Sequence, residues 1–79
     1  MKIEEFKQRL GKNIKFVREN GSINGSLKVE SMTKAELSRK ADIDYRTLER
    51  IENGEHSPTS YNLYQIAKVL GVSIDRLIR

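Results

Sequence analysis

Apolar residues recur every three or four positions along the first twenty residues of the chain. The repeat consists of Ile3, Phe6, Leu10, Ile14 and Val17. Residues at this spacing gather on one face of a helix. The pattern therefore predicts a first helix from about Ile3 to Asn20, with this stripe packed in a core.

Two shorter helices are predicted between Thr33 and Gly54. Thr33 stands three residues before Glu36, which is the spacing of a capping box and marks a helix start. Asp42 breaks this helix at a turn, because Asp tolerates the left-handed conformation better than most residues. Asp44 then caps the next helix, which Gly54 ends.

The second of these short helices has a polar outer face. Leu48 and Ile51 face inward, and the residues left outside are Tyr45, Arg46, Glu49, Arg50 and Asn53. Two helices joined by a tight turn form a helix-turn-helix, whose second helix projects polar side chains into a DNA major groove. Arg46 and Arg50 point the same way, and a guanidinium can pair with two acceptors of guanine. An ordinary solvated face is the alternative for these two residues.

The C-terminal third predicts two more helices. A stripe of apolar residues places a fourth helix over Ser60–Leu70, with Thr59 as its cap. Gly71 ends it in the left-handed conformation. Ser73 then starts a short last helix, Ile74 to Arg79, that is more apolar than core closure alone requires.

The segment between the first two helices lacks a helical pattern. Asn24-Gly25 is typical of a type I′ hairpin turn, in which both central residues need positive φ. Ile23 before it, and Leu27 and Val29 after it, alternate with polar residues. The segment predicts either a small β-hairpin that leans on the bundle or a partner, or a mobile loop. If the hairpin forms, we expect a wing beside the DNA, with Lys28 near a phosphate.

Composition narrows the class of protein. With 79 residues, 33% of them charged, the chain is one small domain, residues 1–79. It has no cysteine and a single His56, so neither a disulfide nor a metal site is expected, and no cofactor. No apolar run approaches the roughly 20 residues of a membrane span, and no signal peptide precedes the domain, so we expect a cytoplasmic protein.

Charge and motifs favour a polyanion partner over an enzyme. The net charge of +4 suits a polyanion without requiring one. No nucleophile and base pair is placed by motif, and no glycine-rich phosphate loop is present, so an enzyme is not expected.

The helix-turn-helix region resembles the DNA-binding domain of the Cro and cI phage-repressor family, also called the Xre family. The resembling positions are Thr33, Glu36, Leu37, Ala41, Ile43, Leu48, Ile51, Glu52, Asn53 and Gly54. They continue through Pro58, Leu63, Ile66, Ala67, Leu70, Gly71, Val72 and Leu77. The resemblance implies an all-α fold, a five-helix lambda-repressor-like bundle, which the insertion at 22–31 interrupts here.

The resemblance also implies roles for individual residues. Its base-reading positions fall on Tyr45, Arg46, Thr47 and Arg50. Lys34 takes the place of a phosphate-binding glutamine, and Asn53 with its backbone amide lies near a phosphate.

The resemblance also implies one structural pair, while Thr47 and Glu49 have alternatives that the residues themselves suggest. Arg18 and Glu52 would form a partly buried structural ion pair. Thr47 would alternatively complete the cap of its own helix. Glu49 would accept from a cytosine, reject wrong sites, or pair with Arg46 or Arg50.

Together these observations predict a sequence-specific DNA-binding transcriptional regulator. We expect a repressor of phage or mobile-element type that binds near-palindromic double-stranded DNA as a homodimer, weak in solution and tighter on DNA. In the family the C-terminal region often contributes to that dimer. The alternative is an antitoxin or other protein-interaction module, with the insertion or the apolar tail as the partner surface.

Overall fold

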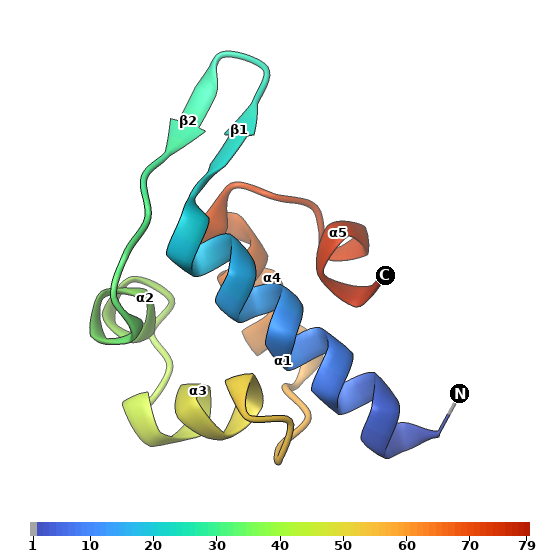
Figure 1. The fold of residues 1–79 in the computed structure, drawn as a ribbon. Helices are drawn as coiled ribbons and strands as arrows, with labels where there is room; N and C mark the ends of the chain where they lie inside the picture. Colours follow the sequence, from blue (N-terminus) through green and yellow to red (C-terminus); the bar gives the residue numbers. More distant parts are fainter. Residues whose placement is uncertain (1) are drawn as a thin grey trace.

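The computed structural model describes residues 2–79, which fold into five helices and one two-stranded hairpin (Figure 1). The elements are α1 (Ile3–Asn20), β1 (Ser22–Asn24), β2 (Leu27–Val29), α2 (Lys34–Lys40), α3 (Tyr45–Glu52), α4 (Ser60–Leu70) and α5 (Ile74–Ile78). The predicted five-helix bundle is confirmed, and the insertion forms the hairpin rather than a mobile loop. The last helix ends one residue before the predicted Arg79.

A single apolar core lies between α1 and the other helices. Its buried members are Leu10, Ile14, Val17, Met32, Leu37, Ala41, Ile43, Leu48, Ile51, Ile66, Ala67, Leu70 and Leu77. Ile3 is exposed, so its predicted place in the core is wrong. The first turn of α1 extends past the neighbouring helices, where no core remains to cover it (Figure 1). No helix in residues 2–79 is long and apolar enough to cross a membrane.

The hairpin differs from the predicted turn. Asn24 pairs with Leu27, so the two loop residues are Gly25 and Ser26, and only Gly25 has positive φ, at 64°. Positive φ at the first loop residue alone is the pattern of a type II′ turn, which favours Gly there. The predicted type I′ turn at Asn24-Gly25 is therefore wrong by one residue, although the hairpin itself forms.

The hairpin leans on the C-terminal end of α4. The Ser22 hydroxyl donates to the Leu70 carbonyl oxygen at 2.6 Å. Gly71 has left-handed φ of 73°, and a Cβ there would meet Val29 at 2.7 Å. These contacts supply the support that an isolated two-stranded hairpin needs in water.

Gly11, in the middle of α1, allows α1 and α3 to pack closely. A Cβ at this position would lie 2.5 Å from the Ile51 carbonyl oxygen and 2.6 Å from that of Glu52. Both neighbours are backbone atoms, which cannot rotate away as a side chain can. The glycine therefore sets how closely α3 approaches α1.

We predict that Gly11→Ala destabilises the domain by at least about 1 kcal/mol. Ala improves helix propensity by about 1 kcal/mol, but a Cβ 2.5 Å from a fixed backbone oxygen belongs at the upper end of overpacking costs, about 3 kcal/mol or more, so a net loss remains. Denaturant unfolding of the variant measures the balance. Lys12→Ala, at the exposed neighbouring position, is the control and should change stability by less than about 0.5 kcal/mol. A Gly11→Ala protein as stable as wild type would contradict the close approach.

Candidate nucleic-acid interface

The start of α2 is fixed by a complete capping box. The Thr33 hydroxyl accepts from the Glu36 backbone N–H at 3.1 Å, and Glu36 Oε1 accepts from the Thr33 N–H at 2.9 Å. These hydrogen bonds to the Thr33 backbone and side chain lower the pKa of Glu36. The predicted helix start is confirmed.

The turn between α2 and α3 requires one residue in the left-handed conformation. Asp42 supplies it, with φ of 57°, as its sequence position predicted. The Ile43 N–H donates back to the Ser38 carbonyl oxygen at 2.9 Å, and the Ile43 side chain is buried. The turn is therefore tight and anchored in the core.

Asp44 caps α3. Its Oδ2 accepts from the backbone N–H groups of Arg46 at 3.1 Å and Thr47 at 3.3 Å. Thr47 takes part in this cap through its backbone amide and not through its hydroxyl. The side chain of Thr47, which is half-buried, is thus left for another contact.

The buried and exposed faces of α3 divide as the sequence predicted. Leu48 and Ile51 are fully buried, whereas Arg46, Arg50 and Asn53 are exposed. Within residues 2–79 the side chains of these three residues make no hydrogen bond or ion pair. The structure places them on a helix at the outer edge of the molecule (Figure 1).

The backbone amide of Asn53 is engaged within the protein. It donates to the Glu49 carbonyl oxygen at 3.0 Å. The predicted phosphate contact through this amide is therefore not available. Only the exposed side-chain amide of Asn53 remains for it.

Lys34, at the start of α2, lies against α3. Its Nζ is 3.8 Å from Glu49 Oε2 and 6.0 Å from the centre of the Tyr45 ring. Glu49 therefore pairs with Lys34. The ion pair with Arg46 or Arg50, one of the alternatives that the sequence suggested for Glu49, does not form. Both Lys34 and Glu49 are partly exposed, and such pairs contribute about 0 to 1 kcal/mol.

Lys28 lies apart from the other predicted phosphate contacts. It belongs to β2, and its Nζ lies 3.5 Å from Glu30 Oε1, with both side chains exposed. The hairpin projects from the end of the molecule opposite α3 (Figure 1). The structure thus brings Tyr45, Arg46, Arg50 and Lys34 together but leaves Lys28 outside the group.

Arg18 and Glu52 form the ion pair that the resemblance implied. Arg18 Nε donates to Glu52 Oε2 at 2.7 Å, and Nη2 donates to Oε1 at 2.9 Å. Both residues are buried, and hydrogen bonding to Glu52 raises the pKa of Arg18 against the opposing effect of burial. The pair fixes the C-terminal end of α3 to α1.

The part played by Met32 was not predicted. Arg18 Nη1 donates to the Met32 carbonyl oxygen at 3.2 Å, and the Met32 N–H donates to the Arg18 carbonyl oxygen at 3.0 Å. The chain thus leaves α1 beside Arg18, forms the hairpin and returns to the same residue. No local sequence signal marks this closure, because it joins backbone groups fourteen residues apart.

Comparison with known families places this geometry in a class. A helix-turn-helix family model matches residues 30–77, which include α2 to α4 and all of α5 but its last residue. The chain belongs to the Cro/C1-type helix-turn-helix family, and it is a DNA-binding regulator in the general sense of that family. A search of curated protein sequences finds no match.

We predict that Glu52→Ala destabilises the domain by about 3 to 5 kcal/mol, because it leaves the buried Arg18 charge unpaired. A domain of this size has only about 4 to 12 kcal/mol of stability, so Glu52→Gln, which keeps one acceptor oxygen, is measured beside it. Urea unfolding of both variants measures the loss in the free energy of unfolding.

Glu49→Ala is the matched control, because Glu49 lies on the same helix in an exposed pair; its loss should stay below about 1 kcal/mol. Replacing Arg18 and Glu52 together by Met should restore part of the loss. Equal losses for Glu49→Ala and Glu52→Ala would show that the buried pair has no special weight.

Proposed function

We propose that this protein is a sequence-specific transcriptional repressor of phage or mobile-element type that binds a near-palindromic operator as a dimer. The observation that carries the proposal is the pair of exposed, unpaired guanidinium groups of Arg46 and Arg50 on α3. The tight turn at Asp42 and the Asp44 cap hold the helix that carries these two arginines.

Arg46 and Arg50 are proposed to read base edges. Residues four apart on a helix lie on one face, with a rise of about 6 Å between them. That rise corresponds to about two base-pair steps of B-DNA, which has 3.4 Å per step. Each guanidinium can bond both acceptors of a guanine, the commonest specific contact in the major groove. Tyr45 and Thr47 flank them and complete the proposed reading set.

Lys34 and Asn53 are proposed to hold the phosphate backbone on either side of α3. Lys34 lies at the start of α2, and its pair with Glu49 at 3.8 Å is long. Exchange of Glu49 for a phosphate would free the carboxylate to repel wrong sites or accept from a cytosine. The Lys28 contact is not part of this proposal, because the hairpin lies at the other end of the molecule (Figure 1).

The proposed dimer surface lies on α5. Leu77 is fully buried and closes the core, whereas Ile74 and Ile78 remain 36% exposed. So small an apolar area supports a weak dimer in solution. When two protomers bind the two half-sites of one duplex, each is held at a high effective concentration near the other, which would tighten the dimer.

A second candidate function is a protein-interaction module such as an antitoxin. The observation that favours it is the exposed apolar hairpin, on which Ile23 is 77% exposed. An Ile23→Ser variant that no longer binds a protein partner but still binds DNA would separate this function from the first.

Arg46→Ala is expected to weaken binding to the preferred duplex by about 1 to 3 kcal/mol and to leave binding to scrambled DNA nearly unchanged. The reason is that a base contact discriminates between sequences and a phosphate contact does not. Fluorescence anisotropy titrations on both duplexes, at one fixed salt concentration, measure the two losses.

Arg9→Ala is the control for Arg46→Ala. Arg9 is an exposed arginine on α1, so its substitution removes the same charge. It should lower both affinities slightly and equally. An equal loss on both duplexes for Arg46→Ala would make Arg46 a phosphate contact and would remove the main support for the proposal.

Ile78→Asp is expected to weaken binding to a two-half-site duplex at least about tenfold, with an unchanged affinity for a single half-site. A charge at the dimer surface opposes association but touches no DNA. Sedimentation of the free wild-type protein should show mainly monomer at micromolar concentration. A tight dimer without DNA, or the same loss on both duplexes, would contradict the proposed surface.

A further inference from the structure

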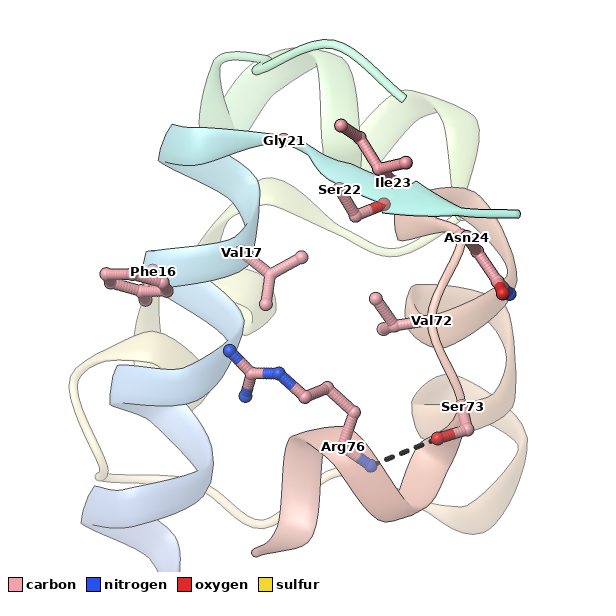
Figure 2. A pocket seen from close by; sticks show the side chains of 10 residues that line it. Phe16, Val17, Gly21, Ser22, Ile23, Asn24, Val72, Ser73 and Arg76 are labelled. Atoms are coloured by element: carbon pink, nitrogen blue, oxygen red, sulfur yellow. Dashed lines mark hydrogen bonds between the residues drawn. The ribbon is translucent and has the colours of Figure 1, made fainter. Parts of the chain in front are cut away.

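A groove of about 480 Å³ opens beneath the inserted hairpin. Figure 2 shows its boundaries: β1 above, the end of α1 on one side, and the α4–α5 connection and α5 on the other. The volume lies in the range of small-molecule sites, about 300 to 1,000 Å³. The groove exists because the insertion adds a wall that α1, α4 and α5 alone would not provide.

The lining of the groove is mixed, with polar and apolar surface in about equal parts. Phe16, Val17 and Val72 line it, and the Phe16 side chain is 58% exposed although it is large and aromatic. The Ser22 hydroxyl is engaged by the Leu70 carbonyl oxygen. The Ser73 hydroxyl accepts from the Arg76 backbone N–H at 3.2 Å. Of these apolar residues, Phe16 leaves the most side-chain surface uncovered.

Arg76 supplies the one cationic side chain of the lining. Its side chain extends from α5 toward α1, below Phe16 and Val17 (Figure 2). Within residues 2–79 no carboxylate lies within ion-pair distance of its guanidinium. By contrast, Arg79 on the same short segment pairs with Asp75 at 2.7 Å, and Arg18 pairs with Glu52. A half-buried guanidinium in the groove is thus left without an anion.

We propose that this groove binds a small monocarboxylate with an aromatic or branched apolar body. The planar guanidinium of Arg76 matches a carboxylate through two parallel hydrogen bonds. The apolar body would cover the exposed Phe16 ring and the half-buried Val72.

The chemistry of the lining selects this class over other anions. A single guanidinium balances one negative charge, and the exposed Phe16 ring favours an apolar body over the polar body of a nucleotide or sugar phosphate. The groove lies on the hairpin side of the molecule, away from α3 (Figure 1). Ligand and DNA would therefore occupy separate surfaces, and the inference does not rest on the proposed function.

Titration of ¹⁵N-labelled protein with phenylacetate, 3-phenylpropanoate and 4-methylpentanoate tests the inference without DNA. We expect saturable amide shifts confined to Gly21–Asn24 and Val72–Leu77, with a dissociation constant on the order of millimolar, as suits about ten heavy atoms. Phenylacetamide, which has the same body without the charge, should bind at least about tenfold more weakly. Failure of all three acids to saturate below about 20 mM, or equal binding of the amide, would overturn the proposal.

Arg76→Met and Arg79→Met form a matched pair of variants. Both remove one arginine from the C-terminal segment, but only Arg76 lines the groove. Arg76→Met should weaken phenylacetate binding at least about tenfold, and Arg79→Met should leave the affinity within about twofold of wild type. Denaturant unfolding of both variants checks that each still folds. If concentrating the protein alone moves the same amides and the acids do not compete, a second copy fills the groove and the proposal fails.

Discussion

One buried ion pair holds the parts of this domain in register. The Arg18 guanidinium reaches Glu52 at the end of α3 and the Met32 carbonyl oxygen at the end of the insertion. Removing two charges from water costs several kcal/mol per ion, and good geometry with further hydrogen bonds is needed to offset that cost. Here two donors meet both carboxylate oxygens and a third meets the backbone, so α1, α3 and the entry to α2 have one low-energy arrangement.

This arrangement separates the rigid from the exchangeable interactions of the helix-turn-helix. The Asp42 turn, the Asp44 cap and the close approach at Gly11 are short contacts to backbone atoms, and they fix where α3 points. The contact of Lys34 with Glu49 is long and exposed, and contributes little. A charged surface that can change partners, on a helix held by these contacts, suits the proposed discrimination between DNA sequences.

Much of the fold was predictable, because local signals in the sequence agree with its tertiary contacts. Thr33 with Glu36, Asp42 and Gly71 each require a particular backbone conformation, and each marks its boundary correctly. The failures involve distant partners. Nothing near Gly11 shows that α3 approaches it, Lys34 was not expected to take Glu49 from Arg46 or Arg50, and the groove at Arg76 exists only when residues sixty positions apart meet.

The central claim, that α3 reads a symmetric operator, is tested most directly by selecting bound duplexes from a random library at moderate salt. The account predicts an inverted repeat whose two halves are centred about one DNA turn apart and contain guanines that the arginines of α3 can contact. Affinity for this site should exceed that for scrambled DNA by about 10³-fold or more. A pool that stays random, with binding that vanishes as salt rises, would contradict the account.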